Sequence, residues 1–330
     1  MRTIRIGTRT SKLALEQTRL VGEGLVDTAR ARGGALAYEL VGMTTEGDRI
    51  LDQPLDKIGG KGLFIRELDR AMLAGRIDIA VHSYKDLPAE LDPSVRIGAV
   101  SVREDPRDVL VLPADAPAGT AETFDAAVSY IARTGLPVGC SSARRRVQLQ
   151  RLMPGVPVAS VRGNVNTRIA KLDAGQYGAL VLAAAGLKRL GLYTRMSCVF
   201  APREMLPAAG QGAMAVTVAR DVDADLRALL AAYSNDEAAL CVAAERAFTR
   251  ALGGDCATPC GAYAEVRDAE LFLEGLYAEP DGSVLVRRSG QVTVGAPGPD
   301  GAYGAAAYAA ATSCAERLAG EVREALDGGR

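Results

Sequence analysis

Two side chains of this sequence stand where they could take part in catalysis. Cys256 lies in the stretch LGGDCATPCG, which has two glycines shortly before the thiol and a proline after it. A buried structural cysteine is the usual default, but a thiol on a glycine-flanked loop is more often available as a nucleophile. Asp86 comes just after a buried strand expected at 77–81, where α/β sheets place ligand-binding residues. The sequence thus offers one candidate nucleophile and one candidate carboxylate.

The neighbours of Asp86 allow two interpretations of its role. His82, Ser83 and Lys85 precede it. In the first interpretation Asp86 is an ordinary loop carboxylate paired with Lys85. In the second it is an anion that stabilises a cationic intermediate or moves protons. The residues alone leave both open.

A strongly basic segment is the clearest feature of the composition. Between Arg133 and Arg203 there are twelve Lys and Arg residues and one acid, Asp173, although the whole chain has a net charge of −1. Several of these arginines flank turns that open helices, where free N–H groups attract anions. Because the guanidinium fork pairs with carboxylates, the segment suits a ligand with many carboxylates or phosphates. A solvated basic face is the alternative. Nucleic acid is less favoured, since few aromatic side chains are available for stacking and no nucleic-acid-binding module is recognisable.

The remaining composition excludes several classes of site. The single histidine, His82, rules out zinc sites built from two or three histidines. Cys256 and Cys260 are spaced too widely for a zinc knuckle, so we expect no metal. Six scattered cysteines form no disulfide framework, and the N-terminus carries no signal peptide. No apolar run is long enough to span a bilayer. We therefore expect a cytoplasmic protein that does not bind membranes.

Hydrophobic periodicity predicts alternating strands and helices over the first two-thirds of the chain. A helix follows GTRTS, with Thr10 or Ser11 as its N-cap. This alternation favours parallel or mixed sheets covered by helices, and the change of pattern after residue 222 predicts a separate α+β domain. We expect strands at 3–6, 37–43, 77–81, 109–112, 158–161, 179–183, 262–266, 271–278 and 283–289, helices at 63–74, 238–252 and 305–326, and strand–turn–helix units at GCSSARRRVQLQRL and RGNVNTRIAKLD.

A series of motifs resembles one family in the same order over nearly the whole chain. The series is GTRTSKLALEQ, GGKGLF, IDIAVHSYKDLP, REDPRD, GCSSARRRVQL, VRGNVNTRIAKLD, AAAGLKRLG, LPAAGQGA and ERAFTRALGGDCATP. Together they resemble the hydroxymethylbilane synthase (porphobilinogen deaminase) family.

The resemblance implies an α/β fold with two doubly wound domains, similar to periplasmic binding proteins, that flank a cleft. A small C-terminal α+β domain follows them. Domain 1 would comprise 1–102 and 208–221 with Asp86, domain 2 would be the arginine-rich 107–207, and domain 3 would be 222–330 with the Cys256 loop. The first two domains would be joined by two crossings, near 102–107 and 207–211.

The activity implied by the resemblance is a transferase reaction of haem and corrin biosynthesis. Four porphobilinogen molecules are condensed head to tail with release of ammonia, and hydrolysis frees hydroxymethylbilane. The chain grows on a dipyrromethane cofactor held by a thioether, which corresponds to Cys256. Asp86 would stabilise the positive charge of the azafulvene formed when ammonia leaves.

The resemblance also implies a set of binding residues and partners. The cofactor and substrate carboxylates would be bound by Arg9, Ser11, Ser83, Lys85, Ser142, Arg144, Arg145, Arg162, Arg168 and Arg189, and the cleft would be shaped by Phe64, Gln211 and Gln17. The enzyme would be a monomer that takes porphobilinogen as substrate and hands its product to uroporphyrinogen-III synthase.

Three residues depart from the family pattern. Cys140 stands where threonine is common, Asp255 where glycine is usual, and Cys260 where an aliphatic residue is usual. An anion at Asp255 is expected to raise the pKa of the neighbouring thiol and slow cofactor loading. A different class of function is a two-lobed anion-binding or sensor protein that kept the fold and lost the chemistry. Because Cys256 and Asp86 are both present, the enzyme is favoured.

Overall fold

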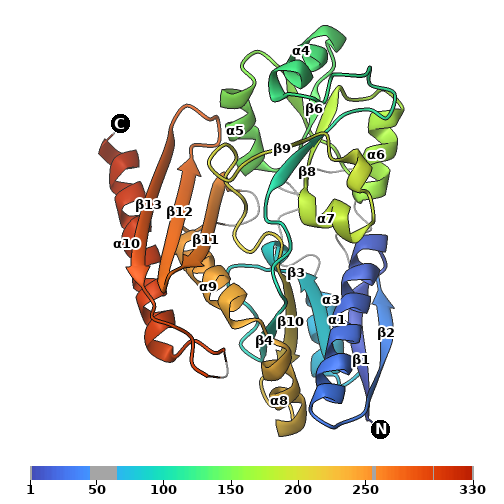
Figure 1. Cartoon of the computed structure of the whole chain (residues 1–330), viewed down its shortest axis with the longest axis vertical. Helices are drawn as coiled ribbons and strands as arrows, with labels where there is room; N and C mark the ends of the chain where they lie inside the picture. Colours follow the sequence, from blue (N-terminus) through green and yellow to red (C-terminus); the bar gives the residue numbers. More distant parts are fainter. Residues whose placement is uncertain (1, 45–64, 255–257, 300, 329–330) are drawn as a thin grey trace.

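Three β-sheets divide the chain into two lobes and a C-terminal domain (Figure 1). The computed structural model describes residues 2–44, 65–254, 258–299 and 301–328. The N-terminal lobe lies at the bottom of Figure 1, the central lobe above it, and the C-terminal domain to one side of both. Among the described residues, no helix is both long and apolar enough to cross a membrane.

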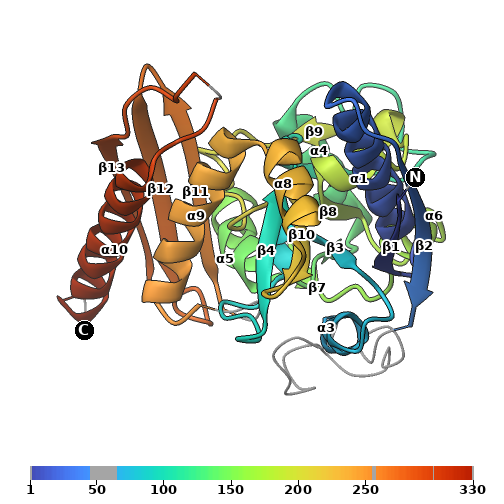
Figure 2. The same ribbon diagram turned by 90° about the horizontal axis from the view of Figure 1, so that it is seen from below.

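The N-terminal lobe is built on a mixed five-stranded sheet of order β2-β1-β3-β10-β4. Strands β1 to β3 are parallel, and β10 runs antiparallel to both of its neighbours. Helices α1 and α8 share a core with one face of the sheet, and α3 packs on the other face (Figure 2). The bounds are β1 Arg2–Arg9, α1 Lys12–Ala31, β2 Leu36–Met43, α3 Arg66–Leu73, β3 Ile79–Ser83, β4 Val95–Val100, β10 Met214–Ala219 and α8 Ala224–Tyr233.

Helix α8 belongs to this lobe by its packing. Leu226 and Leu230 are buried in one cluster with Ile4, Val21 and Val218. The expected start of the third domain at residue 222 is therefore too early, because the apolar face of α8 is covered by α1 and β4. We place the boundary at the short connection between α8 and α9.

The central lobe repeats this architecture with the sheet order β7-β6-β8-β5-β9. Helices α4 and α5 pack on one face and α6 and α7 on the other. The bounds are β5 Asp108–Val111, α4 Phe124–Thr134, β6 Val138–Gly139, α5 Ala143–Leu152, β7 Val158–Ala159, α6 Val165–Asp173, β8 Ala179–Ala183, α7 Ala184–Arg189 and β9 Cys198–Val199. The expected pair of doubly wound domains is thus confirmed.

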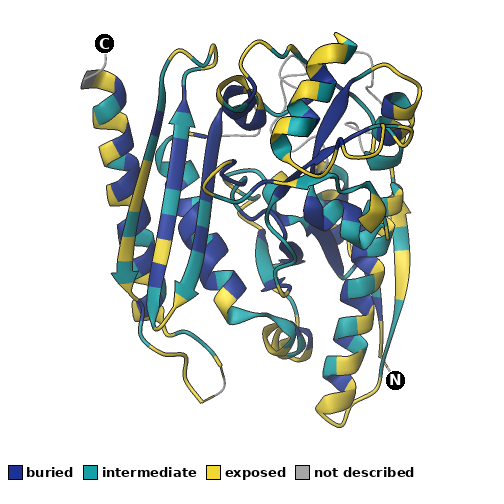
Figure 3. Ribbon diagram, turned by 45° about the horizontal axis from the view of Figure 1, so that its top comes forward, coloured by how far each residue is buried: buried dark blue, intermediate teal, exposed yellow. Residues whose placement is uncertain are grey.

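The C-terminal domain is a three-stranded antiparallel sheet covered on one face by two helices. Its elements are α9 Asp236–Ala251, β11 Cys260–Arg267, β12 Glu270–Ala278, β13 Leu285–Thr293 and α10 Ala305–Gly328. The burial pattern along β12 alternates as expected for a sheet with one covered face (Figure 3). The expected small α+β domain is confirmed.

Two segments cross between the lobes, as the resemblance implied. The first joins β4 to β5 through 101–107, and the second joins β9 to β10 through 200–213. They touch closely at Gly212, whose φ is +95° and whose hypothetical Cβ would lie 2.2 Å from the carbonyl oxygen of Glu104. Only glycine fits that position without moving the first crossing.

Side-chain caps explain where several helices begin. Ser11 accepts a hydrogen bond from the Ala14 amide at the start of α1, and Ser142 accepts one from the Arg145 amide at the start of α5. Asn164 caps α6 in the same way. The expected cap at Thr10 or Ser11 is therefore Ser11.

Candidate active site

Asp86 ends a short 3₁₀ turn, Tyr84–Asp86, directly after β3. Its side chain is exposed, whereas Tyr84 and Leu87 on either side are buried. The turn is held by a hydrogen bond from the Tyr84 amide to the Ala213 carbonyl at 3.1 Å and by one from the Leu87 amide to the Tyr84 carbonyl at 3.1 Å. The strand end thus presents a carboxylate on a fixed turn, where α/β sheets bind ligands.

The Lys85 side chain is bonded to Gln211 rather than paired with Asp86. Its ammonium donates a hydrogen bond to Oε1 of Gln211 at 3.1 Å, and the ion pairs of the described residues do not join it to Asp86. The simple loop pair of Lys85 with Asp86 is therefore not the arrangement found. Burial, together with the nearby charge of Arg145, lowers the pKa of Lys85 to about 8.

A fully buried carboxylate, Asp108, lies opposite this turn at the start of β5. Arg144 donates from Nη1 to Oδ2 at 2.8 Å, and Arg145 donates from Nε and Nη2 to Oδ1 at 3.0 and 2.7 Å. Although burial alone would raise the pKa of Asp108, the two guanidinium charges hold it well below its usual range. One carboxylate therefore faces two guanidinium groups, and the cluster keeps a net positive charge.

Gln211 connects this cluster to the Asp86 turn. It lies on the second crossing and is 1% exposed. Its Nε2 donates to Asp108 Oδ1 at 2.8 Å and to the Pro106 carbonyl at 2.6 Å, while its Oε1 accepts from Lys85. One amide side chain thus joins both lobes and both crossings.

Three further arginines of the expected set are half-buried. Arg168 on α6 donates from Nε to the Gly163 carbonyl at 2.7 Å, and Arg162 lies in the same turn before α6. Arg189 on α7 donates to the Gly212 carbonyl at 2.6 Å and so contacts the second crossing. Burial lowers the pKa of Arg168, and the nearby charges of Arg145 and Arg162 lower it further. Such mutual repulsion marks a surface with an excess of positive charge.

Asp86 faces this positive surface across the lobes. Its negative charge raises the pKa of Arg145 and Arg168 in the central lobe, against the lowering effect of their burial. The Asp86 charge also raises the pKa of the neighbouring Lys85, against the larger lowering effect of burial. The acid of one lobe and the bases of the other therefore interact electrostatically.

Further expected residues of the N-terminal lobe lie on or next to β1, α1 and β3. Gln17 is buried and donates from Nε2 to the Ser83 hydroxyl at 3.0 Å, so the two side chains are hydrogen-bonded to each other. Ser11 caps α1 beside Arg9 at the end of β1. His82 is buried and its Nε2 lies 2.9 Å from the Thr217 hydroxyl. Burial lowers the pKa of His82 to about 4, which keeps it neutral.

Several expected residues lie outside the described residues: Cys256, Asp255 and Phe64. The described chain approaches Cys256 through Gly253 and Gly254 after α9 ends. Cys260, which begins β11, is buried, and burial raises the pKa of its thiol to about 12. Cys140 is also buried, with its thiol 3.6 Å from the Ser142 carbonyl and a pKa raised by burial. These two thiols are therefore poor nucleophiles.

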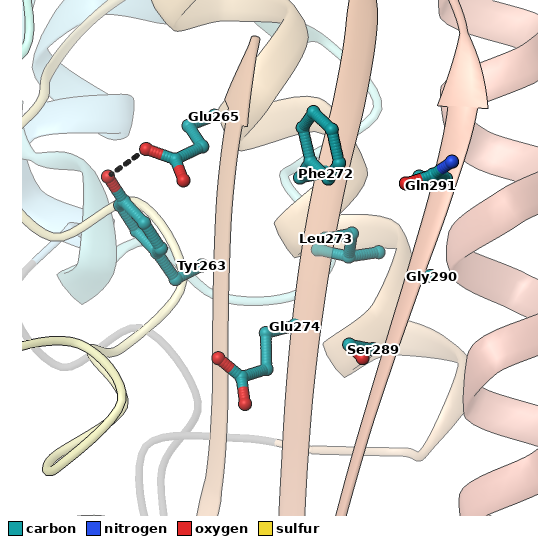
Figure 4. Close-up of a pocket in the computed structure, with 8 residues that line it drawn as sticks. All are labelled: Tyr263, Glu265, Phe272, Leu273, Glu274, Ser289, Gly290 and Gln291. Atoms are coloured by element: carbon teal, nitrogen blue, oxygen red, sulfur yellow. Dashed lines mark hydrogen bonds between the residues drawn. The ribbon is translucent and has the colours of Figure 1, made fainter. Parts of the chain in front are cut away.

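A hollow of about 410 Å³ lies elsewhere, on the open face of the C-terminal sheet (Figure 4). Its acids are already neutralised, because Glu265 pairs with Arg267 and Glu274 pairs with Arg287. It therefore lacks the charge expected of an anion site. Its lining residues are Tyr263, Glu265, Phe272, Leu273, Glu274, Ser289, Gly290 and Gln291.

Sequence reasoning missed the residues that hold the site together. Asp108 lies outside the basic segment between Arg133 and Arg203, although it neutralises part of that segment. Arg103 on the first crossing pairs with the buried Glu245 of α9 at 2.6 Å, and Glu245 accepts a hydrogen bond from the Gly210 amide at 2.6 Å. The only signal for this ion pair was a charged residue within the alanine-rich pattern of α9.

Comparison with known proteins identifies the chain's relatives. A family model described as "Porphobilinogen deaminase, dipyromethane cofactor binding domain" matches residues 4–228, and one for the C-terminal domain matches 239–319. The chain belongs to the porphobilinogen deaminase family. Family membership confirms the expected enzyme class, a transferase of tetrapyrrole biosynthesis with a dipyrromethane cofactor.

Curated members of the porphobilinogen deaminase family align over most of the chain. The enzyme of Acetivibrio thermocellus is 46% identical over 281 residues, covering 85% of this chain and 89% of its own length. That of Chromobacterium violaceum is 46% identical over 294 residues, with 88% of each chain covered. Among solved structures, the periplasmic VFT2 domain of Bordetella pertussis BvgS is 18% identical, with a TM-score of 0.41 and 72% of this chain and 90% of that chain covered.

Proposed function

We propose that this chain acts as a hydroxymethylbilane synthase, with Asp86 as its catalytic carboxylate and Cys256 as the attachment point of its cofactor. The observation that carries the proposal is the exposed Asp86 turn facing an excess of arginine charge from the other lobe. A cationic intermediate needs an adjacent anion, and a ligand with many carboxylates needs cations around it. Both requirements meet at this place in the fold.

In this proposal Asp86 acts on porphobilinogen at the stage when ammonia is lost. When ammonia leaves the aminomethyl arm, positive charge develops on the pyrrole and is shared with the ring nitrogen. A carboxylate close to that nitrogen stabilises the charge and accepts the proton that is lost on coupling. Backbone hydrogen bonds of Tyr84 and Leu87 hold the 3₁₀ turn that carries Asp86, which limits the backbone reorganisation needed during the reaction.

The basic side chains fit the carboxylates of a dipyrromethane and of the growing chain. Arg9, Arg162, Arg168 and Lys85 supply charge at half-buried positions, where charge-assisted hydrogen bonds are stronger than in water. Arg144 and Arg145 are already bonded to Asp108, so we assign them a contribution through charge rather than as exposed forks. Ser11, Ser83, Ser142 and Arg189 complete the proposed set, with Gln17, Phe64 and Gln211 shaping the site.

The chemistry of this donor set fits the dipyrromethane cofactor. Each pyrrole of that group carries an acetate and a propionate, and the site holds more cations than anions. When bound, the cofactor supplies the nucleophilic pyrrole carbon to which the first substrate is joined. Cys256 needs to act as a nucleophile once, when the cofactor is loaded.

The cellular location, the oligomeric state and the partners of the enzyme are part of the same proposal. We assign the enzyme to the cytoplasm and to a monomeric state, as the family resemblance implied. Hand-over of the unstable linear product to uroporphyrinogen-III synthase is part of this proposal, as is the absence of nucleic-acid and membrane partners.

Intact-protein mass spectrometry tests the proposal. The purified protein should weigh more than its sequence by two condensed pyrrole units, and Cys256→Ser should weigh only its sequence. Cys260→Ser is the matched control and should retain the added mass. An anion-binding protein without the chemistry would show no added mass after incubation with porphobilinogen, and that result would refute the proposed function.

A further inference from the structure

Helix α9 of the C-terminal domain contacts the segment that follows Asp86. Arg246, on this helix, donates from Nη2 to the Ala89 carbonyl at 2.7 Å and also to the Pro88 carbonyl. These acceptors come two and three residues after Asp86. Because Pro88 has no N–H group, this stretch has fewer backbone bonds of its own to fix it. The guanidinium group supplies two bonds from another domain.

Apolar packing attaches the same helix to the Asp86 turn. Leu87 and Tyr84 are buried in one cluster with Ala238 and Val242 of α9. Tyr84 also lies against Gly210, whose φ is +74° and whose hypothetical Cβ would be 2.3 Å from the tyrosine ring. The turn is thus enclosed between the second crossing and α9, and a shift of α9 would move it.

Helix α9 is also bonded to both interlobe crossings. Glu245, adjacent to Arg246, is 0% exposed and bonds Arg103 and the Gly210 amide. The helix ends at Ala251, shortly before Cys256 in the sequence. One rigid helix therefore links the segment after Asp86, the interlobe crossings and the start of the cofactor loop.

We propose that Arg246 is a positioning residue for the condensation reaction, fixing the Asp86 turn relative to the helix that leads to the attachment cysteine. This inference rests on the proposed function. Arg246 acts through the Pro88 and Ala89 carbonyls and touches neither substrate nor cofactor. It thereby holds the carboxylate at the distance from the tethered chain end that coupling requires, and displacements of about 1 Å are enough to cost about a hundredfold in rate.

The test compares Arg246→Met with Arg250→Met in the cofactor-loaded protein. Arg250 lies on the same helix one turn later and is exposed, so it is a matched control for the loss of one charge. We expect Arg246→Met to keep the added pyrrole mass, to lower kcat by about ten- to a hundredfold, and to change KM by less than about threefold. Amide hydrogen exchange in 84–91 should become at least about threefold faster. Arg250→Met should match the parent in all of these.

Each other outcome is decisive. Unchanged kcat with faster exchange would show a structural role only, and lower kcat with unchanged exchange would place the defect elsewhere; either result overturns the inference. If Arg246→Met does not fold, Arg246→Lys takes its place, with an intermediate loss of kcat and of exchange protection expected, and parent-like values overturn the inference. A parent protein that lacks the pyrrole mass refutes the proposed function itself, independently of the Arg246 variants.

Discussion

The Lys85 ammonium of one lobe donates a hydrogen bond to Gln211 Oε1, 3.1 Å away on the crossing that leads to the other lobe. The same Gln211 donates to Asp108, which binds Arg144 and Arg145. The residue beside Asp86 is therefore connected, through one buried amide, to the basic cluster of the central lobe. A substitution beside Asp86 is therefore expected to affect the basic cluster, and a substitution in the cluster is expected to affect the surroundings of Asp86.

Asp108 should be essential for stability. Asp108→Asn removes the carboxylate that pairs with Arg144 and Arg145 and leaves two buried cations together. Breaking a buried ion pair from one side costs about 3–5 kcal/mol, so the melting temperature should fall by at least about 5 °C. Asp173→Asn, which breaks the more exposed pair with Arg195, is the control and should lower it by less than about 2 °C. Differential scanning calorimetry measures both melting temperatures. Equal decreases in the two variants would contradict the stabilising role of Asp108.

Asp86→Asn should abolish most turnover without unfolding the protein. An amide cannot neutralise the cationic pyrrole, and the exposed position of Asp86 means that the substitution removes no buried contact. We expect kcat below about a tenth of the parent value, which corresponds to more than about 1.4 kcal/mol of barrier. Steady-state kinetics test the loss of turnover, and the melting temperature of the same cofactor-loaded sample tests whether the fold is kept. A variant with more than a tenth of parental kcat would remove Asp86 from the mechanism.

Lys85 should give the affinity for porphobilinogen a pH dependence. Burial lowers the pKa of Lys85 to about 8, so its ammonium loses its proton as the pH rises through that value. Its contribution to carboxylate binding is complete below this pH and lost above it, and KM should increase by about three- to tenfold between pH 7 and 9. Lys85→Arg keeps its charge in this range and should show no such increase. The same rise in both proteins would mean that another group titrates.

His82 should make the fold sensitive to acid. Burial lowers the pKa of His82 to about 4 in the folded chain, against about 6.5 when unfolded. The unfolded state therefore binds a proton first as the pH falls through this window, which removes up to about 3 kcal/mol of stability. His82→Gln should lose less stability between pH 6.5 and 4 than the parent does. Urea unfolding across that range gives the comparison, and parallel curves would exclude His82 as the cause.

Arg162 and Arg168 should affect chain growth more than folding. Both are half-buried at the start of α6, and their surroundings carry excess positive charge. Arg162→Leu and Arg168→Leu should slow porphobilinogen consumption by at least about tenfold, since each loses a charge-assisted bond to a carboxylate. Arg151→Leu alters an exposed arginine of α5 and serves as the control. Unaltered consumption in the two α6 variants would refute the carboxylate-binding role.

The regular elements were largely predictable because their apolar residues repeat with a clear period. The strand expected at 179–183 has the bounds found for β8, and the helix expected at 305–326 differs from α10 by two residues at its end. Sequence analysis missed β10, whose MAVTVA reads as a short apolar stretch, and α8, whose alanine-rich pattern has a weak apolar face. Short apolar segments do not reveal which sheet they join.

The site was predicted in its parts but not in its connections. The positions of Asp86 and of the basic segment follow from strand ends and composition, and the motifs supplied their roles. Two sets of ion pairs join residues that are far apart in the sequence. Asp108 pairs with two arginines, and Arg103 pairs with Glu245, which lies 142 positions further along the chain. Such contacts depend on how whole domains pack, which no local pattern records.

The strand order of the N-terminal sheet has a consequence for how the protein is made. Strand β10 lies between β3 and β4, yet it is encoded after the entire central lobe. During synthesis the central lobe, whose strands are contiguous in sequence, can complete its sheet while the first lobe still lacks an interior strand. Strand β10, which pairs with the strand β3 that leads to Asp86, is thus synthesised only after the arginine-rich central lobe. A chain truncated before residue 214 would expose two unpaired strand edges, one on β3 and one on β4.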